Sequence, residues 1–341
     1  MHATPPAAST RPALGQLALL RGVSRSFYLS IRLLPAPLRE PVGVAYLLAR
    51  ATDTVADTAE LPAPDRTSAL TTLAAAIDGD LAARAVLAGP MAAFAARQHD
   101  ADERALILAL PQCLAWLDVL DAADRADVRT VLRHITRGQT LDVQRFGAGG
   151  PVHALANTAE LEEYTWLVAG CVGEFWTDLC VRHLPDFATL PAQDMRALGR
   201  AYGSGLQLIN ILRDAGADLS AGRCYLPADA LTAVGLAPRD IVAQPERLMF
   251  IYTHWLGEAG LRLEQGMRYC GALRHRRLRA ASALPALLGA RTLALLRQAG
   301  PQALATRVKV PRAEVRQILL GVALTLAANG PLQARFRRLA G

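Results

Sequence analysis

Apolar residues recur along most of this chain with the spacing of an α-helix. In the stretches 102–120 and 124–146 they return at positions i, i+3, i+4 and i+7, which places them on one helical face. Alternating patterns typical of strands are almost absent, and short segments rich in Pro and Gly, such as 35–37, 61–64 and 147–150, separate the helical stretches. Ala, Leu and Arg dominate, and all three favour helix. The sequence therefore predicts an all-α fold of many helices without internal repeats.

Composition favours one domain. The 341 residues are 52% apolar, which is ample for a large core, and no break in composition marks a boundary. We expect a short disordered leader over 1–13 and a single domain over 14–341. No signal-type apolar core stands at the N-terminus, and no apolar run reaches the roughly 18 residues of a membrane span. Five cysteines without CxxC spacing argue against disulfides or a zinc site. These features predict a cytoplasmic protein.

The net charge of +7 favours contact with an anionic substrate or an anionic membrane surface. Nucleic acid is the rival partner, but it would need base-stacking aromatics or a groove-reading motif, and the basic cluster 274–279 has neither. That cluster is a solvated helix end, a membrane contact or a site for cofactor phosphates. The chain closes at 335–341 without a hydrophobic helix. We expect no nucleic-acid partner and, where there is membrane contact, peripheral contact at the inner face.

Two aspartate pairs carry the clearest chemical signal. Asp53 and Asp57 are spaced i, i+4, and so are Asp214 and Asp218. On a helix, both carboxylates of a pair leave the same face one turn apart, where like charges repel. A cation is therefore expected at each pair. Mg²⁺ prefers oxygen ligands and usually binds through a few carboxylates together with substrate phosphates. Two pairs facing each other would hold a diphosphate between them.

Arginine and amide side chains surround both pairs. Arg50 precedes Asp53 by about one turn, and Arg223 follows the second pair within Gly-Arg-Cys-Tyr-Leu-Pro. Three further residues precede the second pair: Gln207, Asn210 and Arg213. Guanidinium groups bind phosphate oxygens in bidentate fashion, and amides add neutral hydrogen bonds. A lone pair of this kind is usually a solvated helix face, but two pairs with these neighbours indicate diphosphate binding.

Glycines mark one further segment, Val-Ala-Gly-Cys-Val-Gly at 168–173. Glycine inside a helix costs about 1 kcal/mol, so Gly170 and Gly173 are expected to serve either close helix packing or room for a ligand. The sequence leaves both open. Gly203 and Gly205 do not form a dinucleotide fingerprint, because no strand precedes them and Leu208 stands at the third glycine position.

Four stretches, 24–27, 46–57, 164–173 and 207–227, resemble the squalene/phytoene synthase family, and the resemblance extends over about residues 20–325. The pattern of 283–293 followed by the basic segment 307–312 resembles squalene synthases in particular. The resemblance implies an isoprenoid synthase helical fold with a central active-site cavity. It also implies a Mg²⁺-dependent prenyltransferase of isoprenoid, sterol or hopanoid biosynthesis.

The resemblance assigns roles to individual residues. The metal ligands would be Asp53, Asp57, Asp214 and Asp218. Contacts to diphosphate would come from Ser24, Arg25, Arg50, Gln207, Asn210, Arg213 and Arg223. Lys309 and Arg312 lie in the basic segment that the resemblance places near the reductive half-reaction, so they are expected to bind NADPH. Catalytic roles would fall to Phe27, Tyr46, Arg50 and Tyr164, the aromatic ones lining the cavity, where Trp166, Phe175 and Trp176 are further candidates for cation–π contacts.

The implied reaction joins two farnesyl diphosphates head to head through presqualene diphosphate, a cyclopropylcarbinyl diphosphate, and then reduces this intermediate with NADPH to squalene. Phytoene, dehydrosqualene or hydroxysqualene synthesis without reduction is the alternative, and a catalytically inactive binding subunit is another. Three positions depart from the family. Ala56 and Ala217 stand where many relatives carry Glu, which predicts weaker Mg²⁺ binding, and Leu167 replaces a Tyr of some squalene synthases. In those enzymes the resemblance gives this Tyr a role in moving the proton, and Tyr164, one turn earlier, would take over part of it.

Overall fold

The computed structural model describes residues 14–23, 27–147, 149–325 and 329–341. The expected leader over 1–13 lies outside them, so it remains a prediction, as does the single domain. The N-terminal half contains α1 (Leu14–Val23), α2 (Phe27–Leu33), α3 (Ala36–Asp57), α4 (Ala63–Asp78), α5 (Leu81–Val86), α6 (Ala88–Arg97), α7 (Ala101–Leu108), α8 (Leu110–Asp118) and α9 (Ala122–Phe146). The all-α class predicted from the periodicity is confirmed.

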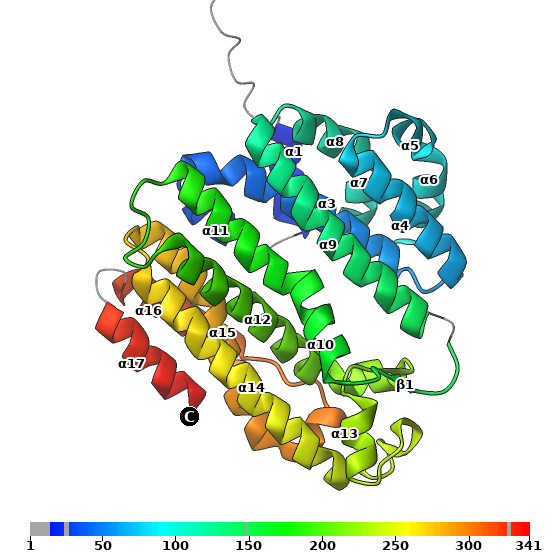
Figure 1. The fold of residues 1–341 in the computed structure, drawn as a ribbon, viewed down its shortest axis with the longest axis vertical. Coiled ribbons are helices and arrows are strands. Elements are labelled where there is room, and N and C mark those ends of the chain that lie inside the picture. Colours follow the sequence, from blue (N-terminus) through cyan, green and yellow to red (C-terminus); the bar gives the residue numbers. More distant parts are fainter. Residues whose placement is uncertain (1–13, 24–26, 148, 326–328) are drawn as a thin grey trace, which may run out of the picture.

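The second half continues with helices and two very short strands. It comprises β1 (His153–Ala154), α10 (Thr158–Thr165), the π-helix η1 (Trp166–Gly170), α11 (Cys171–His183), α12 (Ala192–Ser220), β2 (Arg223–Cys224), α13 (Ala228–Ala233), the 3₁₀-helix η2 (Pro238–Asp240), α14 (Pro245–Ala272), α15 (Arg276–Ala299), the 3₁₀-helix η3 (Gly300–Leu304), α16 (Arg312–Thr325) and α17 (Asn329–Ala340). Figure 1 shows α9, α11, α12 and α14 running side by side across the molecule.

The two stretches with the clearest helical periodicity have different outcomes. The stretch 124–146 lies in a single helix, α9. The stretch 102–120 is divided between α7 and α8. Pro111 explains the division, since its ring removes a backbone N–H and fits best in the first turn of a helix, where it stands in α8. A new helix therefore begins at Leu110.

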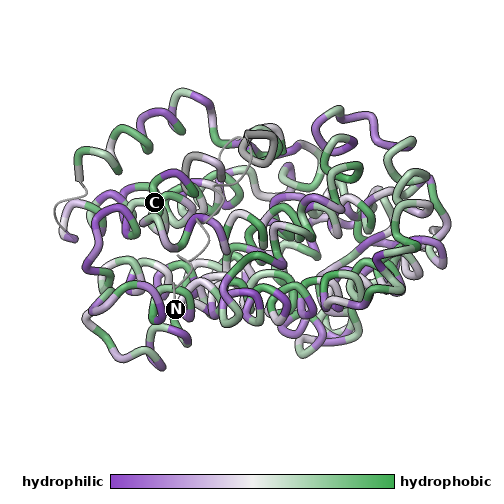
Figure 2. Tube along the Cα trace, turned by 90° about the horizontal axis from the view of Figure 1, so that it is seen from above, coloured by the Kyte–Doolittle hydropathy of each residue, from purple (hydrophilic) through white to green (hydrophobic). Residues whose placement is uncertain are grey.

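Buried apolar side chains form two clusters. One joins α3, α4, α6, α8, α9 and α11, and the other joins α12, α14 and α15. Figure 2 shows hydrophobic and hydrophilic stretches following one another within single helices, as expected for helices that pack on one side. No helix in the described part of the chain is long and apolar enough to cross a membrane.

Glycines let α12 approach η1 and α11 closely. A Cβ added to Gly173 would clash with the carbonyl oxygen of Gly199, and one added to Gly203 would clash with that of Ala169. A Cβ on Gly170 would lie 2.6 Å from Ser204 Oγ. Close helix packing is therefore the role of the glycines in 168–173, whereas the room for a ligand lies beside the valines of the same segment.

Candidate active site

A cavity of about 350 Å³ lies among α3, α9, α10, η1, α11 and α12. One part of its wall is polar, formed by Arg50, Asp53, Gln139 and Gln207. The rest is mainly apolar and aromatic, lined by Val42, Ala45, Tyr46, Ala49, Val131, Ile135, Tyr164, Val168, Val172, Phe175 and Trp176. A space of this kind suits a molecule with a charged head and a long hydrocarbon tail.

The first aspartate pair occupies the last turns of α3. Arg50 Nη1 donates to Asp53 Oδ2 at 2.6 Å, and Arg50 also pairs with Glu103 of α7. Burial and the neighbouring Asp57 raise the pKa of Asp53 to about 7, although Arg50 opposes the rise. Burial also raises the pKa of Asp57, against the pull of Arg223 and Arg50. This electrostatic strain is what a bound cation would relieve.

The second pair lies in the last turns of α12. Burial pushes the pKa of Asp214 upward, but Arg213 at 2.5 Å and Arg307 at 3.4 Å outweigh it and the pKa is lowered. Asp218 pairs with Arg223 at 2.8 Å, yet burial still raises its pKa. Both aspartates of this pair have an arginine partner, but the partners outweigh burial only at Asp214, whereas burial outweighs Arg223 at Asp218.

Arg223 links the two pairs. Its guanidinium contacts Asp218 and acts electrostatically on both Asp57 and the half-buried Asp142. Strand pairing positions it, since Arg223 of β2 lies opposite His153 of β1, and the left-handed turn at Gly222 (φ 79°) leads into the strand. The structure thus brings the two pairs, which are far apart in sequence, around one arginine.

A chain of buried and half-buried hydroxyl and carboxyl groups adjoins the pairs. Tyr225 donates to Asp142 Oδ1 at 2.6 Å, and the rings of Tyr164 and Tyr225 stack with centroids 5.0 Å apart. Burial raises the pKa of Asp142 to about 6, even though the Tyr225 hydrogen bond and Arg223 lower it. Burial likewise raises the pKa of Tyr164 far above its ordinary value. Both tyrosines therefore remain neutral donors.

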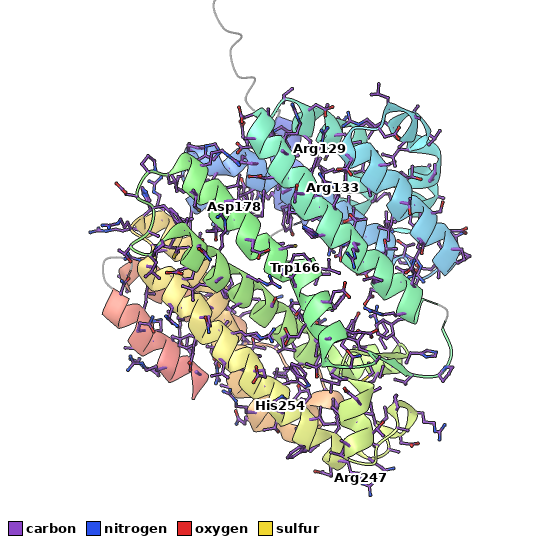
Figure 3. The ribbon with its side chains drawn as sticks, in the orientation of Figure 1. Arg129, Arg133, Trp166, Asp178, Arg247 and His254 are labelled. Atoms are coloured by element: carbon purple, nitrogen blue, oxygen red, sulfur yellow. The ribbon has the colours of Figure 1, made fainter. Side chains whose placement is uncertain are left out.

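The aromatic candidates separate into two groups. Tyr46, Tyr164, Phe175 and Trp176 line the cavity. Trp166 does not: its Nε1 donates to Glu174 at 3.0 Å and its ring packs against His134, on the face turned to the viewer in Figure 3. Trp166 follows Tyr164 by two residues, and side chains at that spacing leave opposite faces of a helix, so ordinary periodicity separates the two rings.

The remaining predicted residues lie around the cavity and the aspartate pairs, or outside the described residues. Gln207 lines the cavity, and the exposed Asn210 donates to it at 3.3 Å. Lys309 and Arg312 are exposed, beyond the point where Arg307 reaches Asp214. Ser24 and Arg25 lie outside the described residues. Phe27 begins α2, but its side chain is not described.

Sequence reasoning missed five residues at this site: Glu103, Gln139, Asp142, Tyr225 and Arg307. Gln139 and Asp142 are spaced i, i+3 within the predicted helix 124–146, so polar residues on one face were an available signal. Tyr225 stood inside the matching motif. Arg307 stood inside the predicted basic segment 307–312, but its place beside Asp214 had no local signal. Glu103 had none either, because tertiary packing alone brings it to Arg50.

The donor set fits Mg²⁺ with a diphosphate rather than a metal centre built from protein alone. Among the described residues, no group of three or more His, Cys, Asp or Glu side chains is arranged to hold a metal ion. The aspartates offer hard oxygen donors in pairs, which suits an ion that completes its shell with phosphate and water. The buried Gln139 Oε1 and Arg223 Nε have no hydrogen-bond partner in the structure, as expected where a polar ligand binds.

The site thus combines paired carboxylates and arginines with an apolar cavity. The family model "Squalene/phytoene synthase" matches residues 20–314. The chain belongs to the squalene/phytoene synthase family, as its motifs predicted.

Relatives and solved structures agree with this assignment. The phytoene synthase of Thermus thermophilus is 31% identical over 320 residues, covering 92% of this chain and 93% of that protein. A bifunctional lycopene cyclase/phytoene synthase of Leptosphaeria maculans is 28% identical over 228 residues, and the match spans 67% of this chain but only 36% of that longer protein.

Two solved structures show the same fold. The complex of TcSQS with the ligand E5700 superposes with a TM-score of 0.72 at 20% identity, covering 96% of this chain and 95% of the other. A dehydrosqualene synthase superposes with a TM-score of 0.59 at 21% identity, covering 92% and 95%. The fold is thus the isoprenoid synthase helical fold that the resemblance implied.

Proposed function

We propose that the protein joins two farnesyl diphosphates head to head through presqualene diphosphate and reduces this intermediate with NADPH to squalene. One observation carries the proposal. A cavity of about 350 Å³ combines an apolar, aromatic wall with a polar wall that contains Asp53 and Arg50, and the second aspartate pair is linked to the first through Arg223.

Ionisation of an allylic diphosphate requires neutralisation of the leaving group. Bound at the aspartate pairs, Mg²⁺ would supply positive charge to the diphosphate oxygens. Arg50, Arg213 and Arg223 contact the same aspartates and are placed to bind the remaining oxygens. Because these arginines are held by ion pairs before substrate arrives, they need little reorganisation to stabilise the departing diphosphate.

The carbocation left behind must be kept from water. The apolar wall excludes water from the farnesyl chain, and the ring faces of Tyr46, Phe175 and Trp176 offer cation–π stabilisation. Formation of the cyclopropane ring releases one proton from the substrate. Tyr164 contacts both the cavity and Tyr225, which donates to Asp142. This chain of groups provides a route by which that proton leaves, with Asp142 as its acceptor.

The reductive half is assigned to the basic segment 307–312. Arg307 approaches Asp214 at 3.4 Å, so the segment begins at the diphosphate site, and the exposed Lys309 and Arg312 follow it. They are suited to the phosphates of NADPH. Gly203 and Gly205 lie inside the long helix α12, which agrees with a cofactor site that uses no Rossmann glycine loop.

Synthesis of phytoene or dehydrosqualene without reduction is the second candidate. It is favoured by the similarity to the Thermus thermophilus phytoene synthase over nearly the full length of both chains. The buried Leu167, which stands in place of a Tyr of some squalene synthases, agrees with it.

Release of pyrophosphate tests whether the protein is an enzyme. Purified protein is incubated with farnesyl diphosphate and Mg²⁺, and pyrophosphate and the lipid product are quantified with and without EDTA. We expect release with Mg²⁺ and its loss with EDTA. Tight binding of farnesyl diphosphate without release would instead support an inactive binding subunit.

A further inference from the structure

Positive charge is concentrated in the last part of the chain. Residues 305–341 contain seven of the 37 Lys and Arg residues and one of the 30 Asp and Glu residues, so this segment carries +6 and the preceding 304 residues carry +1. Its one acidic residue, Glu314, is held by Arg291 of α15 at 2.5 and 3.1 Å. The net positive charge of the protein therefore lies almost entirely in α16, α17 and the segment that leads into them.

Large apolar side chains on α16 face solvent in the same region. Leu320 is 65% exposed and Leu324 is 84% exposed, while Ile318 and Val322 on the other face are buried. Arg316 lies one turn before Leu320 and is also exposed. Leucines at such exposure have almost no contact with the fold, so packing within this chain does not account for them.

A groove of about 530 Å³ runs between α16 and α17, bordered by Leu320, Leu324 and Leu339 and by three arginines, of which Arg291 pairs with Glu314. Arg335 crosses α16 at Gly321, where a Cβ would clash with the guanidinium, and its Nη1 donates to Gln317 O at 3.0 Å. Arg338 lies at the same groove and is exposed. Guanidinium groups beside leucines match the phosphate and the upper acyl chain of a phospholipid.

We propose that the surface formed by α16 and α17 docks on an anionic phospholipid bilayer, with Leu320 and Leu324 inserted and Arg316, Arg335 and Arg338 at the headgroup phosphates. A second copy of the chain is a poor occupant, because self-association would bring two strongly positive surfaces together. Binding of nucleic acid to this surface would account for the arginines but would leave the exposed leucines without a role. Near a membrane surface, a basic residue and an exposed leucine each add affinity.

The docked surface lies one short segment from the candidate active site. Arg307, at the start of 305–311, reaches Asp214, and α16 begins at Arg312. In sequence, this surface therefore follows directly on the segment that reaches the site of the proposed reaction. The membrane proposal does not require that reaction and can be tested without substrate.

Vesicle flotation tests the proposal on the full chain. The wild-type protein is mixed with vesicles of phosphatidylcholine alone or of phosphatidylcholine and phosphatidylglycerol in equal parts. We expect binding to the anionic vesicles and its loss at high salt. The double variant Arg316→Gln/Arg338→Gln should bind roughly 25-fold more weakly, about fivefold for each charge. Leu320→Ser/Leu324→Ser should weaken binding at least roughly tenfold.

Matched controls keep the result specific. Arg276→Gln/Arg277→Gln removes the same charge at the exposed start of α15, and Leu81→Ser/Leu108→Ser removes two leucines that are 78% and 61% exposed. Both controls should bind vesicles like wild type, and thermal melting should be the same for all variants. Equal weakening by the controls would overturn the proposal. So would equal binding to neutral vesicles, a dimer that Leu320→Ser/Leu324→Ser dissociates, or binding to duplex DNA in preference to vesicles.

Discussion

Arg223 lies 2.8 Å from Asp218 and is the cation that the two aspartate pairs share. It comes from β2, not from either of the helices that carry the pairs, and it also opposes the rise that burial causes in the pKa of Asp57 on α3. The arginine therefore holds together two groups of negative charge that would otherwise repel each other across the site. It is also a group that a diphosphate would engage on arrival.

Arg223→Gln should abolish most activity while the protein remains folded. Removing one preorganised donor at a developing negative charge typically lowers kcat by about 10²- to 10³-fold. The measurement is steady-state pyrophosphate release from farnesyl diphosphate. Arg239→Gln, at a position 80% exposed, is the control and should keep wild-type turnover. Less than a tenfold loss in Arg223→Gln would show that this arginine does not stabilise the leaving group.

Asp53→Asn and Asp214→Asn should have opposite effects on the stability of the metal-free protein. The pKa of Asp53 is about 7 in the folded state and about 4 when unfolded, so the folded state binds its proton more tightly and stability falls as pH rises from about 4 to 7. An asparagine side chain does not titrate in this range, so Asp53→Asn does not lose stability as the pH rises. Its melting temperature should therefore exceed that of wild type at pH 8 and approach it near pH 4.

The effect of Asp214→Asn on stability has the opposite sign. The pKa of Asp214 is lowered in the folded state by Arg213 and Arg307 against the effect of burial, so its contribution is present above the unfolded pKa and lost as pH falls. The variant should be less stable at pH 7 by up to about 1 kcal/mol, and the difference should vanish in acid. Thermal melts over the pH range measure both. Parallel shifts in the two variants would contradict the assigned ion pairs.

Gly173→Ala should destabilise the fold, whereas Gly257→Ala should not. A Cβ at Gly173 meets the Gly199 carbonyl in the crossing of α11 and α12, and overpacking of this kind costs roughly 1–3 kcal/mol. Nothing lies within 4 Å of a Cβ at Gly257 in α14, so alanine should add about 0.5–1 kcal/mol there. Urea unfolding compares them. Equal stability of the two variants would show that the crossing can relax.

Lys309→Ala and Arg312→Ala should separate the two half-reactions. If the basic segment binds NADPH, presqualene diphosphate accumulates while pyrophosphate release in the first condensation continues, because only the second step uses the reductant. Product analysis by mass spectrometry follows both. Arg247→Ala, exposed at the start of α14, is the control and should leave both steps unchanged. A parallel loss of both steps would assign the segment a role in folding or membrane contact instead.

The local sequence pattern predicted much of this architecture, and the features that it did not predict have physical causes. Helical periodicity predicted the all-α fold, and the i, i+4 spacing correctly placed Asp53 with Asp57 and Asp214 with Asp218 on helices. Local spacing carries no information on groups that packing brings together. Glu103 reaches Arg50 from α7, and Arg307 reaches Asp214 from beyond η3.

The aromatic wall follows local spacing more closely. Tyr46 and Tyr164 were predicted from their motifs and do line the cavity, whereas Trp166, two residues after Tyr164, leaves the opposite face of the helix. The roles of the aspartates in binding Mg²⁺ and of Lys309 and Arg312 in binding NADPH remain predictions.

The most direct test of the proposed function is the product formed from farnesyl diphosphate and Mg²⁺ with and without NADPH. We predict squalene when NADPH is present and accumulation of presqualene diphosphate when it is omitted. Formation of dehydrosqualene, with its additional central double bond, equally well in both incubations would contradict the reductive assignment. Turnover of geranylgeranyl diphosphate to phytoene in preference to farnesyl diphosphate would contradict the assigned substrate.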